Sequence, residues 1–283
     1  MLNENFHLGT RLDVPAIGLG TWLIDDADAA AAVRNAVEIG YRAIDTAQAY
    51  GNEHGVGVGI KECGVDRDSL FISTKLAAEI KDYEGARDAI DGSLRTLGLD
   101  YIDLLLIHAP QPWADFRGGD YSEGNREAWR AMEEAYHAGK LRSIGVSNFT
   151  ETDLKEITKG AEVAPHVNQL LVHAGNTPVS LLDYCRGHNV FVQAYSPIGH
   201  GAVLENPTIT QMAQKYGVTV AQLCIRYVIQ LGCQALPKTA NPDHMRENAD
   251  VDFVISDEDV QVLRDLDARD YGEDSRFPVY SGK

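Results

Sequence analysis

The sequence predicts a (β/α)8 barrel, in which eight parallel strands form a closed ring with helices outside it. Short apolar runs, often β-branched, recur along the chain, and each is followed by a longer segment with helical periodicity. The runs are apolar at consecutive positions, as expected for parallel strands that are buried on both faces. No Pro/Gly/Ser-rich linker divides the 283 residues, so we expect one barrel domain over residues 1–283. An open doubly wound sheet is less favoured, because no strand is followed by the G-x-G-x-x-G turn of a Rossmann fold.

The predicted strands are spread along the whole chain. They cover residues 16–20, 41–45, 70–75, 103–108, 143–147, 166–170, 190–195 and 234–238. Before the barrel proper, the stretch FHLGTRLDVPAIGLG contains turn residues at Gly9 and Thr10. It therefore predicts an N-terminal β-hairpin that caps the bottom of the barrel.

Several helix boundaries between the strands are also predicted. Ahead of Gly98, a typical helix stop, three apolar residues share one helical face: Ile90, Leu94 and Leu97. A second amphipathic helix is predicted from Thr219 to a stop at Gly232, with its apolar face formed by Val220, Cys224, Tyr227, Val228 and Leu231. Ser256 followed by three acidic residues resembles a capping box at the start of a late helix.

The composition argues against several classes of protein. A net charge of −17 disfavours binding to nucleic acid or to an anionic membrane, because phosphate contacts require clustered Lys and Arg. No apolar run approaches the ~20 residues of a membrane span, and the N-terminus lacks the pattern of a signal peptide. The four cysteines lack C-x-x-C spacing, so we expect reduced thiols and a cytoplasmic protein. We expect a monomer that acts on a small molecule.

Polar side chains follow the predicted strands almost one for one. In a closed barrel the carboxyl ends of the strands meet at one face, so these side chains should converge. Alone, each has an ordinary explanation as a helix cap, a half-buried aromatic, a surface charge or a core histidine. The residues are Asp45, Tyr50 just beyond it, Lys75, His108, Ser147, Asn148, Gln169, Tyr195, Ser196, Lys238 and Thr239.

Asp45, Tyr50, Lys75 and His108 together indicate a tyrosine that acts as a general acid. A phenol with a pKa near ~10 is a poor acid at neutral pH unless its anion is favoured. An ammonium group within hydrogen-bond reach favours the anion, and a carboxylate behind the ammonium keeps it charged. A neutral imidazole beside the phenol could position a carbonyl oxygen. Such an assembly would protonate the alkoxide that forms when a hydride reaches a carbonyl carbon.

The expected hydride donor is a nicotinamide. Its carboxamide matches the side-chain donors and acceptors of Ser147, Asn148 and Gln169. Tyr195 could stack on the ring, and Lys238 with Thr239 could hold a phosphate where a predicted helix begins, at residues 242–248. No metal site is expected, because the histidines lack ligand spacing.

Three separated stretches resemble the signatures of the aldo-keto reductases. They are GYRAIDTAQAYGNEHGVG (40–57), LRSIGVSNF (141–149) and LPKTANPDHMRENADV (236–251). The resemblance extends along nearly the whole chain, and the compact loops are more similar to the bacterial 2,5-diketo-D-gluconate reductase type than to the vertebrate steroid-reducing members. It implies a barrel that binds NADPH without a Rossmann fold and reduces an aldehyde or ketone to an alcohol.

The resemblance implies a role for each matching residue. Tyr50 would be the general acid, and Asp45, Lys75 and His108 would complete a catalytic tetrad. Trp22 would line the substrate pocket, with Trp113 nearby. The cofactor would contact Gly20, Thr21, Trp22, Ser147, Asn148, Gln169, Tyr195, Ser196, Lys238, Thr239, His244, Glu247 and Asn248.

Three positions depart from the family pattern. Ala109 replaces a tryptophan and removes a wall of the pocket, which Trp113 could restore, and Leu171 stands where the family has Glu. His244 replaces the arginine that would hold the 2′-phosphate of NADPH, and histidine is mostly neutral at pH 7. The loss should weaken the preference for NADPH by about 1–3 kcal/mol. We therefore expect NADH to be used as well, with the preference for NADPH growing in acid.

Two other functional classes remain open. A redox-sensing binding subunit, like the barrel-shaped β subunits of potassium channels, would keep this fold but turn over carbonyls poorly. A lyase or isomerase barrel would consume no nicotinamide cofactor. For the reductase, the substrate should be selected by loops 110–128 and 198–207 and by the tail 270–283, with an acidic rim that disfavours anionic sugar acids. Aromatic residues there either line a pocket or pack the loops onto the barrel: Trp113, Phe116, Tyr121, Phe277 and Tyr280.

Overall fold

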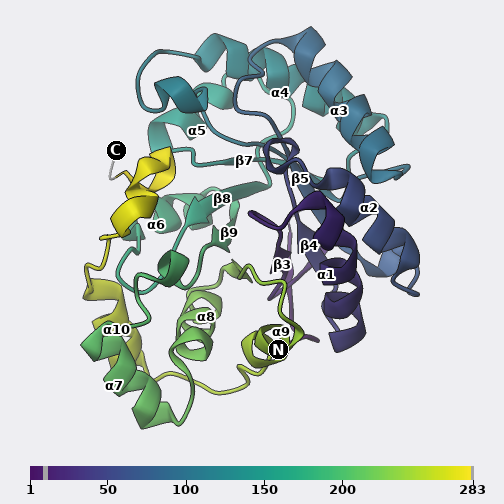
Figure 1. Ribbon diagram of the computed structural model, residues 1–283. Helices are drawn as coiled ribbons and strands as arrows, with labels where there is room; N and C mark the ends of the chain where they lie inside the picture. Colours follow the sequence, from purple (N-terminus) through teal and green to yellow (C-terminus); the bar gives the residue numbers. More distant parts are fainter. Residues whose placement is uncertain (9–11, 282–283) are drawn as a thin grey trace.

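Eight parallel strands form the predicted barrel in the computed structural model, which describes residues 1–8 and 12–281. The strands lie at the centre of the molecule (Figure 1). The strands follow one another around the ring in chain order, from β3 to β10. The ring closes between its first and last strands, where the backbone N–H groups of Gly18 and Gly20 donate to the carbonyls of Ala235 and Pro237 at 2.9 and 3.0 Å. The prediction of a (β/α)8 barrel is confirmed.

Each predicted strand is present, and several are shorter than predicted. The bounds are β3 Leu19–Gly20, β4 Ala43–Asp45, β5 Phe71–Leu76, β6 Leu104–Ile107, β7 Ile144–Ser147, β8 Val167–Leu171, β9 Phe191–Tyr195 and β10 Gln234–Leu236. Residues 16–18 are not part of β3, because Ile17 pairs with Ala235 only as an isolated bridge. β10 ends before Pro237, which has no N–H group to continue the ladder.

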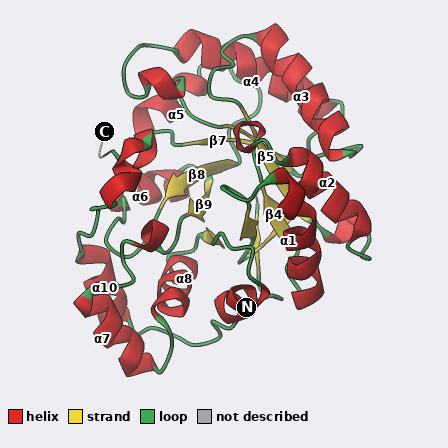
Figure 2. Cartoon of the chain, viewed as in Figure 1, coloured by secondary structure: helices red, strands yellow, loops and turns green. Residues whose placement is uncertain are grey.

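Helices surround the ring of strands (Figure 2). They are α1 Asp26–Ile39, α2 Glu53–Glu62, α3 Tyr83–Leu97, α4 Ser122–His137, α5 Glu151–Ile157, α6 Val179–Gly187, α7 Pro207–Tyr216, α8 Val220–Gln230, α9 Pro242–Ala249 and α10 Asp257–Asp265. Short 3-10 turns are η1 Gln48–Tyr50, η2 Arg67–Ser69, η3 Trp113–Asp115, η4 Gly199–Gly201, η5 Gly272–Arg276 and η6 Pro278–Tyr280. Within the described part of the chain, no helix has the length and apolar character needed to cross a membrane.

The predicted helix ends have identifiable caps. Gly98 adopts a left-handed conformation (φ 67°) and ends α3. Thr219 and Gln222 cap α8 reciprocally. Ser256 accepts the N–H of Asp259 at the start of α10, but the second half of the predicted capping box is not formed. The Asp259 carboxylate instead accepts hydrogen bonds from side chains of α7.

The N-terminal hairpin lies at the bottom of the barrel, as predicted. Strands β1 (Asn5–His7) and β2 (Asp13–Pro15) pair antiparallel, while the predicted turn residues Gly9 and Thr10 lie outside the described residues. Leu8 and Val14 share a buried apolar cluster with residues at the amino ends of barrel strands, namely Phe71, Leu104 and Val167. The hairpin therefore closes the end of the barrel opposite to the carboxyl ends of the strands.

Candidate active site

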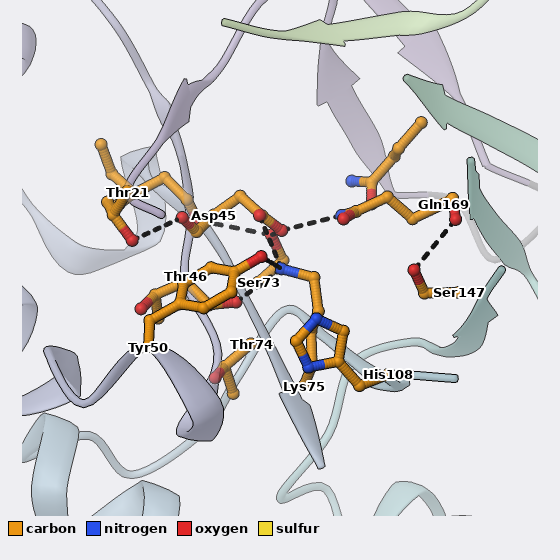
Figure 3. A network of polar contacts seen from close by, with 12 residues as sticks. Thr21, Asp45, Thr46, Tyr50, Ser73, Thr74, Lys75, His108, Ser147 and Gln169 are labelled. Atoms are coloured by element: carbon orange, nitrogen blue, oxygen red, sulfur yellow. Dashed lines mark hydrogen bonds and ion pairs between the residues drawn. The ribbon is translucent and has the colours of Figure 1, made fainter. Parts of the chain in front are cut away.

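Asp45, Lys75 and Tyr50 form one hydrogen-bonded cluster at the carboxyl ends of β4 and β5 (Figure 3). The Lys75 Nζ donates to Asp45 Oδ2 at 2.7 Å, to the carbonyl oxygen of Thr46 at 2.8 Å and to Tyr50 Oη at 3.3 Å. The Lys75 side chain has no exposed surface, and these three acceptors use all the donors of its ammonium group. The ammonium thus connects the carboxylate to the phenol.

The local chain path brings these groups together. Asp45 ends β4 and lies opposite Ser73 in the parallel register with β5. Lys75 lies two residues beyond Ser73, so its side chain points to the same face of the sheet as that of Ser73. The chain then forms the 3-10 turn η1, which ends with Tyr50 and is stopped by Gly51 in a left-handed conformation (φ 68°). Asp45 caps no helix, since the N-cap of α2 is Asn52. The Asn52 amide donates to two carbonyls of the loop after β3, at 2.9 and 2.8 Å.

Burial and charge set the protonation states in this cluster. Burial raises the pKa of Tyr50 and outweighs the opposing effect of Lys75, so the phenol is protonated at neutral pH. The sequence predicted that the ammonium favours the phenolate, and Lys75 does lower the Tyr50 pKa, but burial raises it by more. Burial disfavours the charge on Lys75, but Asp45 and Tyr50 together outweigh it and raise the Lys75 pKa. Burial, reinforced by Lys75 and Lys81, holds the pKa of His108 well below its usual value, and the imidazole is neutral.

His108 follows β6 and lies next to Tyr50. The ring centroids of Tyr50 and His108 are 5.6 Å apart with an edge-on geometry. On another side of His108, the Trp113 ring lies edge-on at 5.0 Å. Ala109 is fully buried, and the Trp113 ring presents an aromatic wall to the histidine. Among the described residues, Nδ1 of His108 has no hydrogen-bond partner.

Amide and hydroxyl groups meet on the neighbouring strands β7, β8 and β9. Ser147 Oγ donates to the carbonyl of Gln169 at 2.9 Å, and Asn148 Nδ2 donates to Ser147 Oγ and to the carbonyl of His108, both at 3.1 Å. Asn148 Oδ1 accepts from the Tyr195 hydroxyl at 2.8 Å. Asn148 has a left-handed backbone (φ 63°), which asparagine tolerates better than most residues. These bonds hold one polar edge in a fixed arrangement.

A cavity of about 330 Å³ lies between the tetrad and this polar edge. Of the loop and tail aromatics considered from the sequence, Trp113, Phe277 and Tyr280 line it, whereas Phe116 is buried and Tyr121 hydrogen-bonds to an aspartate outside it. The described lining includes no Asp, Glu, Lys or Arg side chain. It consists of Trp22, Ala49, Tyr50, His108, Trp113, Ser147, Asn148, Gln169, Tyr195, Phe277, Pro278, Val279 and Tyr280.

The C-terminal tail contributes its side of the cavity through three anchors. The Tyr271 hydroxyl lies 2.8 Å from Nε2 of buried His173, two residues beyond Leu171, the last residue of β8. His200 Nδ1 lies 2.6 Å from a carboxylate oxygen of Asp274. The hydroxyl groups of Tyr280 and Ser196 are 2.6 Å apart, so Ser196 contacts the tail. These anchors hold the aromatic residues of the tail over the mouth of the barrel.

The other residues predicted to contact the cofactor lie outside the lining of this cavity. Gly20 pairs with Lys238 across the closing seam of the barrel, and the Lys238 side chain is exposed. Thr21 is fully buried and its hydroxyl donates to the carbonyl of Asp45 at 2.9 Å. Thr239 Oγ1 accepts the backbone N–H of the residue that caps α9, at 3.0 Å. Thus only Lys238 of these four presents a free charged side chain near the start of α9.

Helix α9 carries the remaining predicted residues. His244 is exposed, Glu247 is half-buried and Asn248 is buried. Arg246 pairs with Asp243 one turn earlier at 3.0 Å, and both side chains are exposed. Asp243 was not considered from the sequence, although an acid beside His244 disfavours a bound phosphate.

Sequence reasoning also missed three polar residues inside the barrel. Ser73 donates to Asp45 Oδ1 at 2.8 Å, and Gln193 and Gln234 extend the polar contacts away from the cavity. A signal was available, because VFVQAY places the glutamine within a predicted buried strand.

The comparisons with known proteins agree with this fold and site. Residues 16–268 match the Aldo/keto reductase family, and the chain belongs to that family. The family reduces carbonyl compounds with NADP(H), and this chain is accordingly a nicotinamide-dependent oxidoreductase. Neither the binding-subunit interpretation nor the lyase or isomerase interpretation is favoured.

Individual relatives cover almost the entire chain. The glyoxal reductase of Bacillus subtilis is 40% identical over 264 residues, which are 93% of this chain and 92% of the relative. The morphine 6-dehydrogenase of Pseudomonas putida is 37% identical and covers 92% of this chain and 90% of its own length. Among solved structures, an aldo-keto reductase of Bombyx mori in complex with NADP has a TM-score of 0.85 at 34% identity, covering 98% of each chain. An aldo/keto reductase of Brucella melitensis has a TM-score of 0.86 at 37% identity, covering 93% of this chain and 99% of its own.

Proposed function

We propose that this chain reduces an uncharged aldehyde or ketone, with Tyr50 donating a proton to the carbonyl oxygen. The observation that carries the proposal is the buried Lys75 ammonium placed between the Asp45 carboxylate and the Tyr50 phenol, beside a cavity. A bound reduced nicotinamide supplies the hydride. As charge develops on the substrate oxygen, the Tyr50 O–H donates its proton, and Lys75 stabilises the phenolate that is left. Neutral His108 donates a hydrogen bond that orients the same oxygen.

We propose that the nicotinamide is held by the polar edge formed by β7, β8 and β9. Its carboxamide would meet Ser147, Asn148 and Gln169, and Tyr195 would stack on the ring. All four line the cavity, which supports this placement. Gly20, Thr21, Trp22 and Ser196 would border the cofactor. Its phosphate and adenine end would contact Lys238, Thr239, His244, Glu247 and Asn248.

We propose that NADPH is the preferred cofactor and that NADH is also accepted. Lys238 supports the preference for NADPH, because its charge is exposed beside α9. Two features reduce that preference: His244 lacks the permanent charge of an arginine, and Asp243 already pairs with Arg246. The ratio of kcat/KM for NADPH and NADH tests this proposal.

The chemical character of the cavity supports neutral substrates with an apolar body. Its described lining carries no charged side chain that could hold a carboxylate. We propose that the chain is of the compact-loop type represented by 2,5-diketo-D-gluconate reductases, but that it prefers uncharged carbonyls to sugar acids. Trp22 and Trp113 would be the principal walls of the substrate pocket.

We propose that the chain acts as a single barrel domain, as a monomer and in the cytoplasm. The proposed chemistry needs no residue from a second copy, because the tetrad and the residues that line the cavity meet within one chain. All four cysteines are free in the described structure, as expected in a reducing compartment.

A carbonyl panel tests the proposed function. Purified protein would be given aromatic aldehydes, small dicarbonyls, keto esters, steroids and a keto sugar acid with each reduced cofactor, and the loss of reduced nicotinamide would be followed by absorbance. We expect turnover with at least one class of neutral carbonyl. If none of these carbonyls increases the rate of cofactor oxidation above the rate without substrate, the proposal is contradicted.

A further inference from the structure

A row of three glutamines crosses the inside of the barrel behind the proposed active site. Gln169 on β8, Gln193 on β9 and Gln234 on β10 occupy matching positions in the parallel register of adjacent strands. Gln169 is 1% exposed and the other two have no exposed surface. Barrel interiors are usually filled with branched apolar side chains, and a buried amide is costly unless it is hydrogen-bonded. The row therefore calls for a reason other than packing.

The hydrogen bonds of the row run in one direction. Gln169 Nε2 donates to Asp45 Oδ1 at 2.8 Å and to Gln193 Oε1 at 3.0 Å. Gln193 Nε2 donates to Gln234 Oε1 at 2.6 Å. At the far end, Gln234 Nε2 has no partner among the described residues. Figure 3 shows the first of these bonds, between Gln169 and Asp45.

The charge of Asp45 determines that direction. A carboxylate paired with an ammonium can only accept hydrogen bonds, so Gln169 must turn its NH2 group toward Asp45. The second N–H of the same NH2 group then requires an acceptor, which is Gln193 Oε1. Gln193 must in turn present its own NH2 group to Gln234. Each amide orientation follows from the one before it.

This arrangement leaves the Oε1 of Gln169 as the group available to the cavity that Gln169 lines. The bond to Asp45 selects which end of the amide faces the cavity, and the second bond, to Gln193, fixes the plane of the amide. An oriented carbonyl oxygen at this point accepts a hydrogen bond from the NH2 group of a carboxamide. A ligand in which a methyl group replaces the carboxamide NH2 has no donor for this oxygen and cannot form the hydrogen bond.

We propose that Gln193, which does not line the cavity, is a positioning residue for the cofactor: it holds the Gln169 amide so that its oxygen recognises the carboxamide NH2 of the nicotinamide. The proposal rests on the proposed placement of the nicotinamide. It adds that Asp45 serves two sites at once, pairing with Lys75 through Oδ2 and orienting Gln169 through Oδ1. Gln234, at the end of the row, is expected to have little effect on cofactor binding. Without Gln234, the Gln193 amide should keep its orientation, because the reversed orientation would place its NH2 group against the NH2 group of Gln169.

The test compares two oxidised cofactors, NADP and its 3-acetylpyridine analogue, in which a methyl group replaces the carboxamide NH2. Dissociation constants are measured by quenching of tryptophan fluorescence in the wild-type protein and in the variants Gln193→Leu and Gln234→Leu. We expect wild type to bind NADP about three- to tenfold more tightly than the analogue, the range of one net hydrogen bond. Gln193→Leu should bring this ratio close to one, while Gln234→Leu should keep the wild-type ratio. Both variants lose the buried hydrogen bond between Gln193 and Gln234. A general loss of stability of the barrel interior would therefore change the binding ratio in both variants.

The conservative variant Gln193→Glu should restore discrimination. Buried near the Asp45 carboxylate, the new carboxyl group takes up a proton and reproduces the acceptor and donor pattern of glutamine. Circular dichroism and thermal unfolding establish that each variant is folded, and Gln193→Met, which is unbranched like glutamine, replaces Gln193→Leu if the latter does not fold.

Each outcome has a distinct meaning. If Gln193→Leu keeps the wild-type ratio, or if Gln234→Leu loses discrimination equally, Gln193 is not a positioning residue. If the wild-type protein binds both cofactors equally, the proposed contact between Gln169 and the carboxamide is wrong, and the role of Gln193 is overturned with it.

Discussion

Removing the Tyr50 hydroxyl leaves the two shorter hydrogen bonds of Lys75 in place, and Tyr50→Phe is therefore the most direct test of the proposed acid. In the structure this hydroxyl is bonded to Lys75 at 3.3 Å, whereas Lys75 keeps shorter bonds to Asp45 and to the Thr46 carbonyl, at 2.7 and 2.8 Å. The variant keeps the ammonium paired with Asp45 but leaves one of its buried N–H donors without an acceptor, so we expect the free energy of unfolding to fall by about 1–3 kcal/mol. The loss of a general acid typically lowers the rate by about 10²–10⁴-fold.

The assay separates chemistry from binding. Steady-state reduction of the best aldehyde in the panel gives kcat, and fluorescence quenching gives the dissociation constant for NADPH. We expect kcat to fall by about 10²–10⁴-fold while the cofactor affinity stays near the wild-type value. Tyr280→Phe is the matched control, because it removes the hydroxyl of another tyrosine that lines the same cavity and bonds to Ser196 at 2.6 Å. Its effect on kcat should stay within about tenfold, the value of one ordinary hydrogen bond.

Retention of more than roughly a tenth of wild-type kcat by folded Tyr50→Phe would refute the acid role. Equal losses in Tyr50→Phe and Tyr280→Phe would also refute it, since they would indicate a shared effect on the shape of the cavity. A large loss of NADPH affinity in Tyr50→Phe alone would place the hydroxyl in cofactor binding instead.

Three further predictions concern the cofactor, acid stability and helix packing. His244→Arg should raise the preference for NADPH over NADH by about 1–3 kcal/mol, measured as the ratio of kcat/KM values, and an unchanged ratio would remove His244 from the phosphate site. Burial lowers the pKa values of His108, His166 and His173, so below about pH 6.5 the unfolded chain binds protons that the folded chain does not. The free energy of unfolding should therefore fall between about pH 7 and about pH 5.5, as measured by denaturant titration. This fall should become smaller when one of these histidines is replaced by a residue that does not titrate. A methyl group at Gly57 would lie 2.2 Å from the carbonyl oxygen of Leu97, so Gly57→Ala should lower the free energy of unfolding by about 1–3 kcal/mol. A methyl group at Gly92, on α3, would meet nothing within 4 Å, so Gly92→Ala should raise the free energy of unfolding by up to about 1 kcal/mol. Melting temperatures equal to that of the wild-type protein would contradict both predictions.

Much of the fold was readable from sequence because it depends on short-range pattern. Eight apolar runs separated by helical periodicity predict eight strands and the helices around them, and caps such as Thr219 and Gly98 are local signals. The bounds were less accurate at the seam of the barrel. Residues 16–18 look like strand, but they contact β10 only at an isolated bridge, and that contact depends on the closure of the ring.

That the four residues of the candidate tetrad lie together was predictable for a different reason. Asp45, Lys75 and His108 each lie at or next to the carboxyl end of a strand, and barrel topology alone places these strand ends together. The sequence could not reveal the protonation states, because these depend on how far burial and neighbouring charges compete. Burial exceeds the effect of Lys75 at Tyr50, whereas Asp45 and Tyr50 together exceed burial at Lys75.

The amino-acid sequence by itself determined the barrel, the family and the candidate tetrad, since each follows from periodicity or from ordered motifs along the chain. Only the tertiary structure decided which polar groups are free to meet a ligand. The hydroxyl of Thr21 is bonded to the Asp45 carbonyl, which leaves other atoms of Thr21 to border the cofactor, and the buried Gln193 is hydrogen-bonded to Gln169. Both outcomes depend on contacts between strands that are distant in sequence, and hydrogen-bond partners at such distances leave no periodic trace in the chain.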